Sequence, residues 1–240
     1  MDEHIFDNYL EVGFKDWNDL SDAGIEKTVK YYKAFFRDIL PTDKNANIVD
    51  LGCGNGQFLK FLKEDGYKNY YGIDISGQQV DFCKEKITDR VRVADAFEFL
   101  SDKKNTFDAI VINDVLEHIP KEKLMLLLGL VRNALKNNGT FMAKVPNMSN
   151  PFGLVSRYID ITHEIGFTEF SMIECLGIAG FKDIKIKGVS YPVISLKTAV
   201  AKMFEIFLHF TIRILLRIQG YIGPKFLHAV IIGVGTKKEA

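Results

Sequence analysis

A glycine-rich turn between a buried strand and a helix constrains the fold of this 240-residue chain more than any other feature. The turn is VDLGCGNG at 49–56; an apolar run at 47–51 leads into it and a helical pattern at 57–65 follows. Glycines there let the polar groups of a ligand approach bare backbone beside the positive end of the helix dipole. The GxGxG spacing differs from the GxGxxG of dinucleotide binders, and no Lys-Ser or Lys-Thr pair follows as in a P-loop. On its own, an ordinary structural turn remains the alternative.

Strand-like and helix-like patterns alternate along the chain. Apolar runs of strand length lie at 47–51, 70–75, 91–94, 107–112, 140–145, 183–189 and 227–236. Helical patterns lie at 23–40, 57–65, 80–86, 121–136 and 168–179. Regular alternation of this kind predicts an α/β fold with helices on both faces of a mostly parallel sheet. No linker or internal repeat interrupts the first 190 residues, so we predict a single domain.

Polar residues follow the predicted strands at equivalent positions. Asp74 ends the second strand, Asp95 follows the third, and Asn113 follows the fourth. The carboxyl ends of parallel strands meet at one edge of a sheet, and a carboxylate after the second strand can accept both hydroxyls of a ribose. Any one of these residues alone would more often be a helix cap or a loop residue. Their shared register therefore predicts one ligand site.

Four segments together resemble the class I S-adenosylmethionine-dependent methyltransferases: VDLGCGNG at 49–56, GIDIS at 72–76, ADAF at 94–97 and FDAIVINDVLEHIP at 107–120. The resemblance covers about residues 47–189 and implies S-adenosylmethionine as the cofactor. It also implies a Rossmann-like seven-stranded sheet whose last strand is antiparallel. We divide the predicted domain into an N-terminal helical cap (1–45), a cofactor-binding core (46–191), a helical insertion (192–225) and a final strand with a tail (226–240).

The same resemblance implies roles for individual residues. The methionine part of the cofactor would lie among Asp50, Gly52 and Gly54, the ribose hydroxyls would bind Asp74, and Asn113 would lie near the cofactor's amino-acid end. Asp95 would face the adenine amino group and Ala96 would offer backbone to the ring. Cys53 and Ile75 complete the predicted lining, with Cys53 as a small packing residue rather than a nucleophile.

The loop after the fifth strand is the predicted wall of the acceptor site, because loops past the carboxyl ends of strands hold the substrate in such sheets. Its PNMSNP (146–151) and RYIDITHE (157–164) patterns resemble methyltransferases of bacterial surface-polysaccharide (capsule and O-antigen) pathways. We predict His163 as a general base, because imidazole titrates near neutral pH; alternatively it only hydrogen-bonds the loop. Arg157 would bind an anionic group on the acceptor, or pair with Asp160 or Glu164. The other predicted substrate-binding residues are Asn147, Tyr158 and His118.

Neither metal nor nucleic acid is expected. Glu117 and His118 are adjacent rather than one helical turn apart, and no second histidine follows them at ligand spacing. The three cysteines lie far apart and give no disulfide or zinc pattern. Lysine plus arginine and aspartate plus glutamate number 31 each, which argues against a nucleic-acid binder. Residues 196–228, however, carry five basic side chains and one acidic.

That basic segment contains a predicted amphipathic helix at 202–219. Glu205, His209, Arg213 and Arg217 recur every four residues and form a polar stripe along an otherwise apolar pattern. Interior charges and limited length argue against a membrane span. The apolar face is expected to dock on the body, on a second copy in a homodimer, or on an anionic membrane. The acidic N-terminus does not read as a signal peptide, so we expect a cytoplasmic protein, with peripheral contact at the inner membrane face as an option.

These features predict methyl transfer from S-adenosylmethionine to a small acceptor, foremost an oxygen of a sugar, sugar nucleotide or surface-glycan precursor. One alternative is O-methylation of a quinone or aromatic precursor. Another, from a different class, is a partner subunit that binds the cofactor without catalysis.

Overall fold

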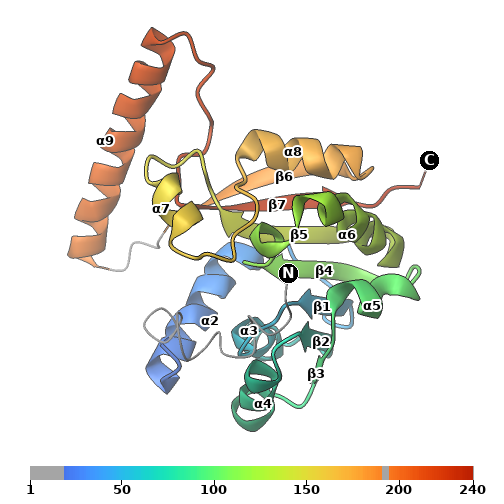
Figure 1. Ribbon diagram of the computed structural model, residues 1–240. Coiled ribbons are helices and arrows are strands. Elements are labelled where there is room, and N and C mark those ends of the chain that lie inside the picture. The colour runs from blue at the N-terminus through green and yellow to red at the C-terminus, as the bar shows by residue number, and fades with distance from the viewer. Residues whose placement is uncertain (1–18, 191–194, 240) are drawn as a thin grey trace.

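The computed structural model describes residues 19–190 and 195–239 and contains one seven-stranded sheet in the order β3-β2-β1-β4-β5-β7-β6 (Figure 1). The strands are β1 (Asn47–Leu51), β2 (Asn69–Asp74), β3 (Val91–Val93), β4 (Phe107–Asn113), β5 (Leu135–Pro146), β6 (Lys182–Val189) and β7 (Val230–Thr236). β1 to β5 pair in parallel, whereas β7 runs antiparallel to both β5 and β6. The predicted fold class, including the antiparallel last strand, is confirmed.

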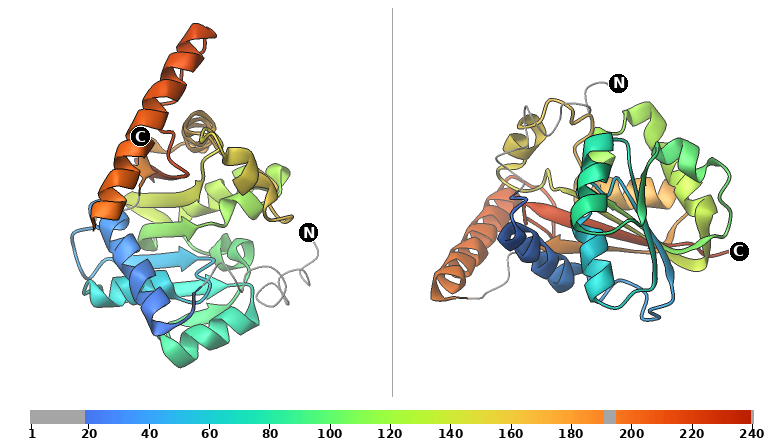
Figure 2. Two further views of the ribbon diagram at one scale, coloured as in Figure 1. Left: turned by 90° about the vertical axis from the view of Figure 1, so that its left-hand side faces the viewer. Right: turned by 90° about the horizontal axis from the view of Figure 1, so that it is seen from below.

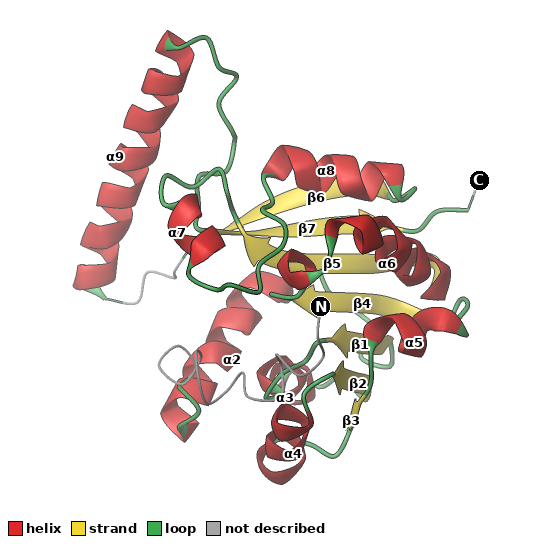
Figure 3. Ribbon diagram, viewed as in Figure 1, coloured by secondary structure: helices red, strands yellow, loops and turns green. Residues whose placement is uncertain are grey.

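Helices cover both faces of the sheet (Figure 3). One face carries α2 (Asp22–Phe36), α3 (Gln57–Glu64) and α4 (Gly77–Lys86), and the other carries α5 (Ala96–Ser101), α6 (Lys121–Ala134) and α8 (Glu169–Ile178). Each face has its own cluster of buried side chains, with Phe36 and Phe58 in the first and Leu127 and Leu176 in the second. This two-sided burial explains the nearly continuous apolar runs of the central strands.

Several boundaries differ from those predicted. The helix expected at 121–136 ends at Ala134, and β5 begins at Leu135 rather than at residue 140. Leu135 is fully buried opposite Phe107 in the sheet, and the register shifts before the pairing resumes at Ala109. Burial of one leucine thus outweighs the helical pattern. The short α5, the 3-10 turn η2 (Leu116–His118) and α7 (Gly153–Tyr158) were not predicted, because elements of one or two turns carry no measurable periodicity. The predicted cap at 1–45 lies partly outside the described residues.

The insertion contains one long helix, α9 (Leu196–Ile218), which begins six residues before the predicted 202–219. Ser195 caps it, and its Oγ accepts a hydrogen bond from the backbone N–H of Thr198. No described residue of α9 belongs to either core cluster, and Figure 2 shows the helix extending away from the body. Among the described helices, none combines the length and apolar character needed to cross a bilayer. The two strands that flank the insertion, β6 and β7, pair with each other, and Val189 lies opposite Val230.

Candidate active site

The glycine turn is held against the end of β2. The backbone N–H groups of Gly52 and Cys53 both donate to the carbonyl of Ile73, at 2.8 and 2.9 Å. Gly52 has a φ of +75°, and a Cβ there would lie 2.3 Å from Val115 Cγ2, so only glycine fits. The backbone path of the turn and its contact with Val115 therefore both require glycine at position 52.

Asp74 lies at the carboxyl end of β2 with its side chain directed at this turn. Its Oδ2 accepts from Gly54 N at 2.7 Å and its Oδ1 from Ser76 N at 2.9 Å. Each carboxylate oxygen keeps a second lone pair, which is the requirement for binding two vicinal hydroxyls. Burial raises the pKa of Asp74, and the backbone hydrogen bonds oppose that shift.

Asp50 and Asn113 form a buried polar floor below the turn. Asp50 is 1% exposed, and burial together with the nearby Asp74 charge raises its pKa to about 8. The amide nitrogen of Asn113 donates to Asp50 Oδ1 at 3.5 Å. The other amide atom, Asn113 Oδ1, finds no hydrogen-bond partner among the described residues. A buried acceptor without a donor is costly, so this position suits a ligand that brings N–H groups.

The ends of β2 and β3 supply the remaining predicted contacts. Ile75 is 37% exposed, and Asp95 and Ala96 are half-buried at the start of α5. Asp95 uses Oδ1 to cap that helix, accepting from Phe97 N at 2.8 Å and Glu98 N at 3.1 Å. This edge of the sheet thus carries an exposed apolar side chain and a carboxylate, the two groups expected to contact an adenine.

These residues fit the expected cofactor, a sulfonium cation with an amino-acid tail. Among the described residues, Asn113 Oδ1 is a buried acceptor without a hydrogen-bond partner, and Asp50, Asp74 and Asp95 give the predicted site carboxylates, where a phosphate would require cations. Asp50, Gly52, Gly54 and Asn113 would hold the amino-acid end. Asp74 would hold the ribose, and Ile75, Asp95 and Ala96 the adenine.

The predicted acceptor side lies where the loop after α7, at 159–168, folds onto η2. The backbone N–H groups of Glu164 and Ile165 both donate to the carbonyl of Glu117, at 2.7 and 3.0 Å. This docking brings His163 beside His118, with ring centroids 4.7 Å apart at 59°. Residues 45 positions apart in the sequence thus meet at the 3-10 turn that follows β4.

A hydrogen bond fixes the tautomer of His163. Its Nδ1 lies 2.9 Å from the carbonyl oxygen of Ser156, which can only accept. The His163 ring is therefore protonated at Nδ1 when neutral and carries its lone pair at Nε2. The Nδ1 of His118 lies 2.8 Å from Thr162 Oγ1, which donates to Asp160 Oδ1 at 2.7 Å. Burial and the neighbouring His163 hold the pKa of His118 below its usual range, so that ring stays neutral near pH 7.

Glu117 completes this cluster. It is 2% exposed, and burial with the nearby Asp114 raises its pKa well above the usual range. Its Oε2 has no hydrogen-bond partner in the described part of the chain. Glu117, His118 and His163 each offer one ligand atom within 4.8 Å of the others, a grouping that the adjacency of Glu117 and His118 does not reveal in the sequence. That no metal binds here stays a prediction.

The other predicted substrate residues have different surroundings. Asn147 is fully buried, and its amide donates to the carbonyls of Phe226 and His228, at 2.9 and 2.8 Å. It therefore supports the wall from behind. Arg157 donates to the backbone carbonyl of Glu164 at 3.1 Å and lies over the Tyr158 ring, which is 75% exposed. Arg157 and Tyr158 remain accessible to an acceptor.

Sequence reasoning missed a buried ammonium group beneath the site. Lys144, on β5, is 8% exposed and forms an ion pair with Asp114, and its Nζ lies 5.7 and 5.9 Å from the ring centroids of Tyr31 and Tyr32. The Asp114 carboxylate and the two tyrosine hydroxyls raise its pKa against the opposing effect of burial. A single lysine within a strand gives no signal of this kind, because nothing marks it as inward-facing.

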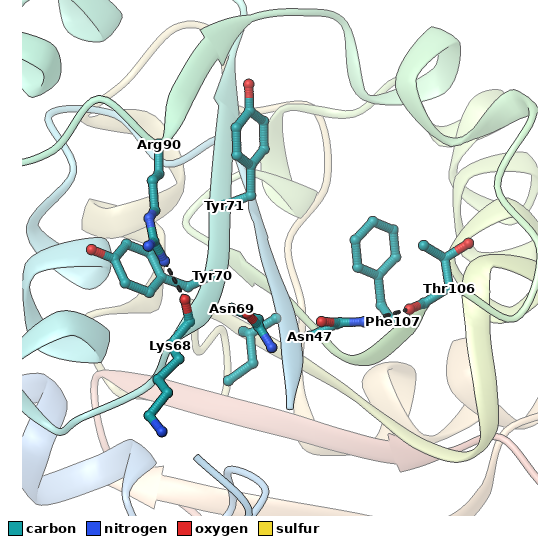
Figure 4. Close-up of a pocket in the computed structure, with 9 residues that line it drawn as sticks. Asn47, Lys68, Asn69, Tyr70, Tyr71, Arg90, Thr106 and Phe107 are labelled. Atoms are coloured by element: carbon teal, nitrogen blue, oxygen red, sulfur yellow. Dashed lines mark hydrogen bonds between the residues drawn. The ribbon is translucent and has the colours of Figure 1, made fainter. Parts of the chain in front are cut away.

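A separate open cavity of about 420 Å³ lies at the opposite, amino-terminal edge of the sheet (Figure 4). Its side chains contact each other: Arg90 binds the carbonyl of Lys68 and stacks over Tyr70, 4.8 Å from the ring centroid. Titratable clusters of the kind found around His163 do not line it, and we assign it no chemistry.

Comparisons with known proteins agree with this geometry. The profile of a family described as a methyltransferase domain matches residues 25–186. The phosphoethanolamine N-methyltransferase of Plasmodium falciparum is 27% identical over 128 residues, which are 52% of this chain and 46% of that protein. This chain thus spans less than half the length of that relative.

Two solved structures share the fold at low identity. A methyltransferase from Archaeoglobus fulgidus, described as dependent on S-adenosylmethionine, is 24% identical with a TM-score of 0.63, covering 99% of this chain and 100% of that one. Phosphoethanolamine N-methyltransferase 2 of Haemonchus contortus, solved with S-adenosyl-L-methionine, is 19% identical with a TM-score of 0.61, covering 94% of this chain and 59% of that one.

Proposed function

Because the chain belongs to the class I S-adenosylmethionine-dependent methyltransferases, we propose that it methylates a hydroxyl oxygen of a small acceptor held between the glycine turn and the α7 loop. The observation that carries the choice of oxygen is the Nε2 lone pair of His163, whose Nδ1–H is held by the carbonyl of Ser156. An alcohol has to lose its proton during methylation, and a neutral imidazole is suited to accept it near pH 7.

The bound cofactor supplies a methyl group activated by the sulfonium. The chain contributes position and proton transfer. The glycine turn and Asp74 fix one partner and the α7 loop the other, which makes the encounter effectively intramolecular. His163 accepts the hydroxyl proton at Nε2, while the carbonyl of Ser156 holds its Nδ1–H and stabilises the imidazolium that forms. Burial and the Asp114 charge raise the pKa of the neighbouring Glu117, which disfavours a carboxylate that would trap that proton.

For the acceptor we propose a sugar hydroxyl of a surface-glycan precursor. Arg157 lies on the same loop as His163, with its guanidinium half-exposed, and is available for the phosphate of a sugar nucleotide or lipid-linked sugar.

An isoprenoid quinone is a second candidate, favoured by the apolar side chains on the same loop. Leu154 is 72% exposed, Tyr158 75% and Ile161 98%. A phenolic acceptor loses its proton more readily than an alcohol, so it depends less on His163. The size of the effect of His163→Ala on the rate therefore distinguishes the two acceptor classes.

The test combines cofactor titration with turnover. We expect His163→Ala to lower the methylation rate by about 10²–10⁴-fold, the usual contribution of a general base, with little change in S-adenosylmethionine affinity. Glu164→Ala is the matched control, because the neighbouring Glu164 side chain is exposed and only its backbone holds the loop. Normal turnover in His163→Ala would remove this residue from the mechanism.

Two further outcomes bear on the proposal. Cofactor binding without turnover on any glycan or quinone precursor would favour a non-catalytic partner subunit. Loss of turnover on dialysis against a chelator, restored by a divalent ion, would mean that a metal takes part in the reaction; Glu117, His118 and His163 are one of the two described groups that could hold it.

A further inference from the structure

The polarity of α9 is inverted relative to an ordinary surface helix. Glu205 and His209 of its polar stripe face the body: His209 is 7% exposed, and its ring packs edge-on against His228 with centroids 5.3 Å apart. Glu205, one turn earlier, accepts from Ser190 Oγ at 2.9 Å and Lys202 Nζ at 2.7 Å. The outward face is apolar instead. Its exposed side chains are Leu196, Val200, Met203, Phe204, Ile206, Phe207, Leu208, Phe210, Ile214, Leu215 and Ile218, each at least 41% exposed.

Packing of α9 against the body does not account for an exposed apolar face of this size. Eleven large apolar side chains cover more than half the circumference of a six-turn helix, whereas a soluble protein rarely exposes a contiguous apolar patch of more than a few hundred Å². Of the three options left open by the sequence, docking of the apolar face on the body is wrong for the described residues. The face needs an external partner.

Basic side chains surround the carboxyl end of this face. Arg213, Arg217 and Lys225 line a cavity of about 530 Å³ between α9, the following loop and the start of α8, together with Phe170 and Tyr221. The acid in this cavity, Glu169, is already engaged, because its two carboxylate oxygens accept from the backbone N–H groups of Lys225 and Phe226, each at 2.9 Å. Three cations beside an apolar surface suit an anionic phosphate group at a lipid–water interface.

The helix lies on the side of the molecule where the candidate active site opens. His228, which contacts α9, precedes Val230, and Val230 pairs with Pro146 at the carboxyl end of β5. The acceptor loop starts at the next residue, Asn147. Figures 1 and 2 show α7 and α9 beyond the same end of the sheet. The exposed apolar side chains of α7 and α9 are thus presented on one side of the protein.

We propose that α9 docks this protein on an anionic phospholipid membrane, with its apolar face in the headgroup boundary and a lipid phosphate in the Arg213–Arg217–Lys225 cavity. The excess of basic side chains favours a membrane over a second copy. A twofold pairing of the same face would bring like-charged rims together, whereas anionic lipid neutralises them. The absence of a spanning helix from the described residues agrees with attachment along the surface.

The experiment is co-sedimentation of the full chain with vesicles of phosphatidylcholine, alone or mixed with phosphatidylglycerol. We expect binding to the mixed vesicles only, weakened by salt. Phe207→Asp places a charge at the centre of the apolar face and should lower the partition coefficient at least about tenfold. Arg217→Glu, which removes one cation and adds an anion, should lower it by roughly thirtyfold.

Matched controls test whether vesicle binding depends on the apolar face of α9. Leu126→Asp changes an equally exposed leucine on α6, and Lys104→Glu reverses an exposed charge before β4; both should bind vesicles as the unchanged chain does. Both α9 variants should have the unfolding temperature and the cofactor affinity of the unchanged chain. If Phe207→Asp fails to fold, Arg217→Glu alone tests the proposal. No binding to the mixed vesicles at low salt overturns the proposal. So does a dimer in light scattering that Phe207→Asp dissociates while vesicles have no effect.

Discussion

The protonation of Asp50 depends on what binds beside it. Its pKa of about 8 means that the buried carboxyl is mostly neutral at pH 7 in the free protein. A cation placed over the glycine turn would favour the ionised form, so cofactor binding should release a proton. In the free protein the ionised form of Asp50 is unfavourable, and a cationic ligand would stabilise it.

We expect Asp50→Asn to separate affinity from stability. The unfolded chain ionises Asp50 near pH 4, so the native state loses stability relative to it as the pH rises from about 4 through 8. At pH 8 the variant should therefore unfold at a higher temperature than the original. Its free energy of unfolding should be larger by on the order of 1 kcal/mol or more. Its cofactor affinity should be lower and should rise less between about pH 6 and pH 8. Equal melting temperatures at pH 8 would contradict this account; calorimetry supplies both measurements.

Asp74→Ala should weaken S-adenosylmethionine binding by roughly 1.5–3 kcal/mol, the usual value for hydrogen bonds to a charged group. Part of the loss reflects the turn itself, because Gly54 N and Ser76 N lose their acceptor. Asp74→Asn keeps one acceptor oxygen and should lose less. Isothermal titration measures the three affinities, and an unchanged affinity in Asp74→Ala would remove the ribose assignment.

At the scale of the elements, strand ends were predictable and loop encounters were not. Asp74, Asp95 and Asn113 follow buried strands, and parallel topology places such residues at one edge whatever the details of packing. The pairing of His118 with His163 depends on a loop that docks through the carbonyl of Glu117, and no pattern in the sequence encodes a bond to a backbone oxygen. Likewise, periodicity located the polar stripe of α9 but not the direction it faces.

The packing of α9 against the body of the protein should depend on pH. Burial lowers the pKa of His209 and His228, so a helix detached from the body takes up protons that the packed helix does not. This packing therefore weakens as the pH falls below about 6.5. Glu205 opposes this effect, whereas Lys202 and Arg213 reinforce it. We expect faster amide exchange across α9 at about pH 5.5 than at about pH 7.5, after correction for intrinsic rates, with β4 as the internal reference. His209→Asn should flatten the dependence; an unchanged one would show that these rings do not control docking.

For the whole molecule, the insertion and the core should be separable. We expect a chain in which a flexible linker replaces residues 192–223 to fold and bind S-adenosylmethionine with unchanged affinity, because Val189 and Val230 already pair in the sheet. The linker must leave Lys225 to His228 in place, since Glu169 and Asn147 bind their backbone. Circular dichroism and titration check this, and an unfolded product would show that α9 belongs to the core.

The pairing of Val189 with Val230 also bears on how such a protein changes over evolutionary time. Residues 192–223 are then open to lengthening, shortening or exchange while every strand keeps its neighbours, as long as Lys225 to His228 stay in place. The catalytic chemistry and the place where it is carried out are then under separate selection. Relatives with the same strand ends need not share a location, and relatives at the same location need not share an acceptor.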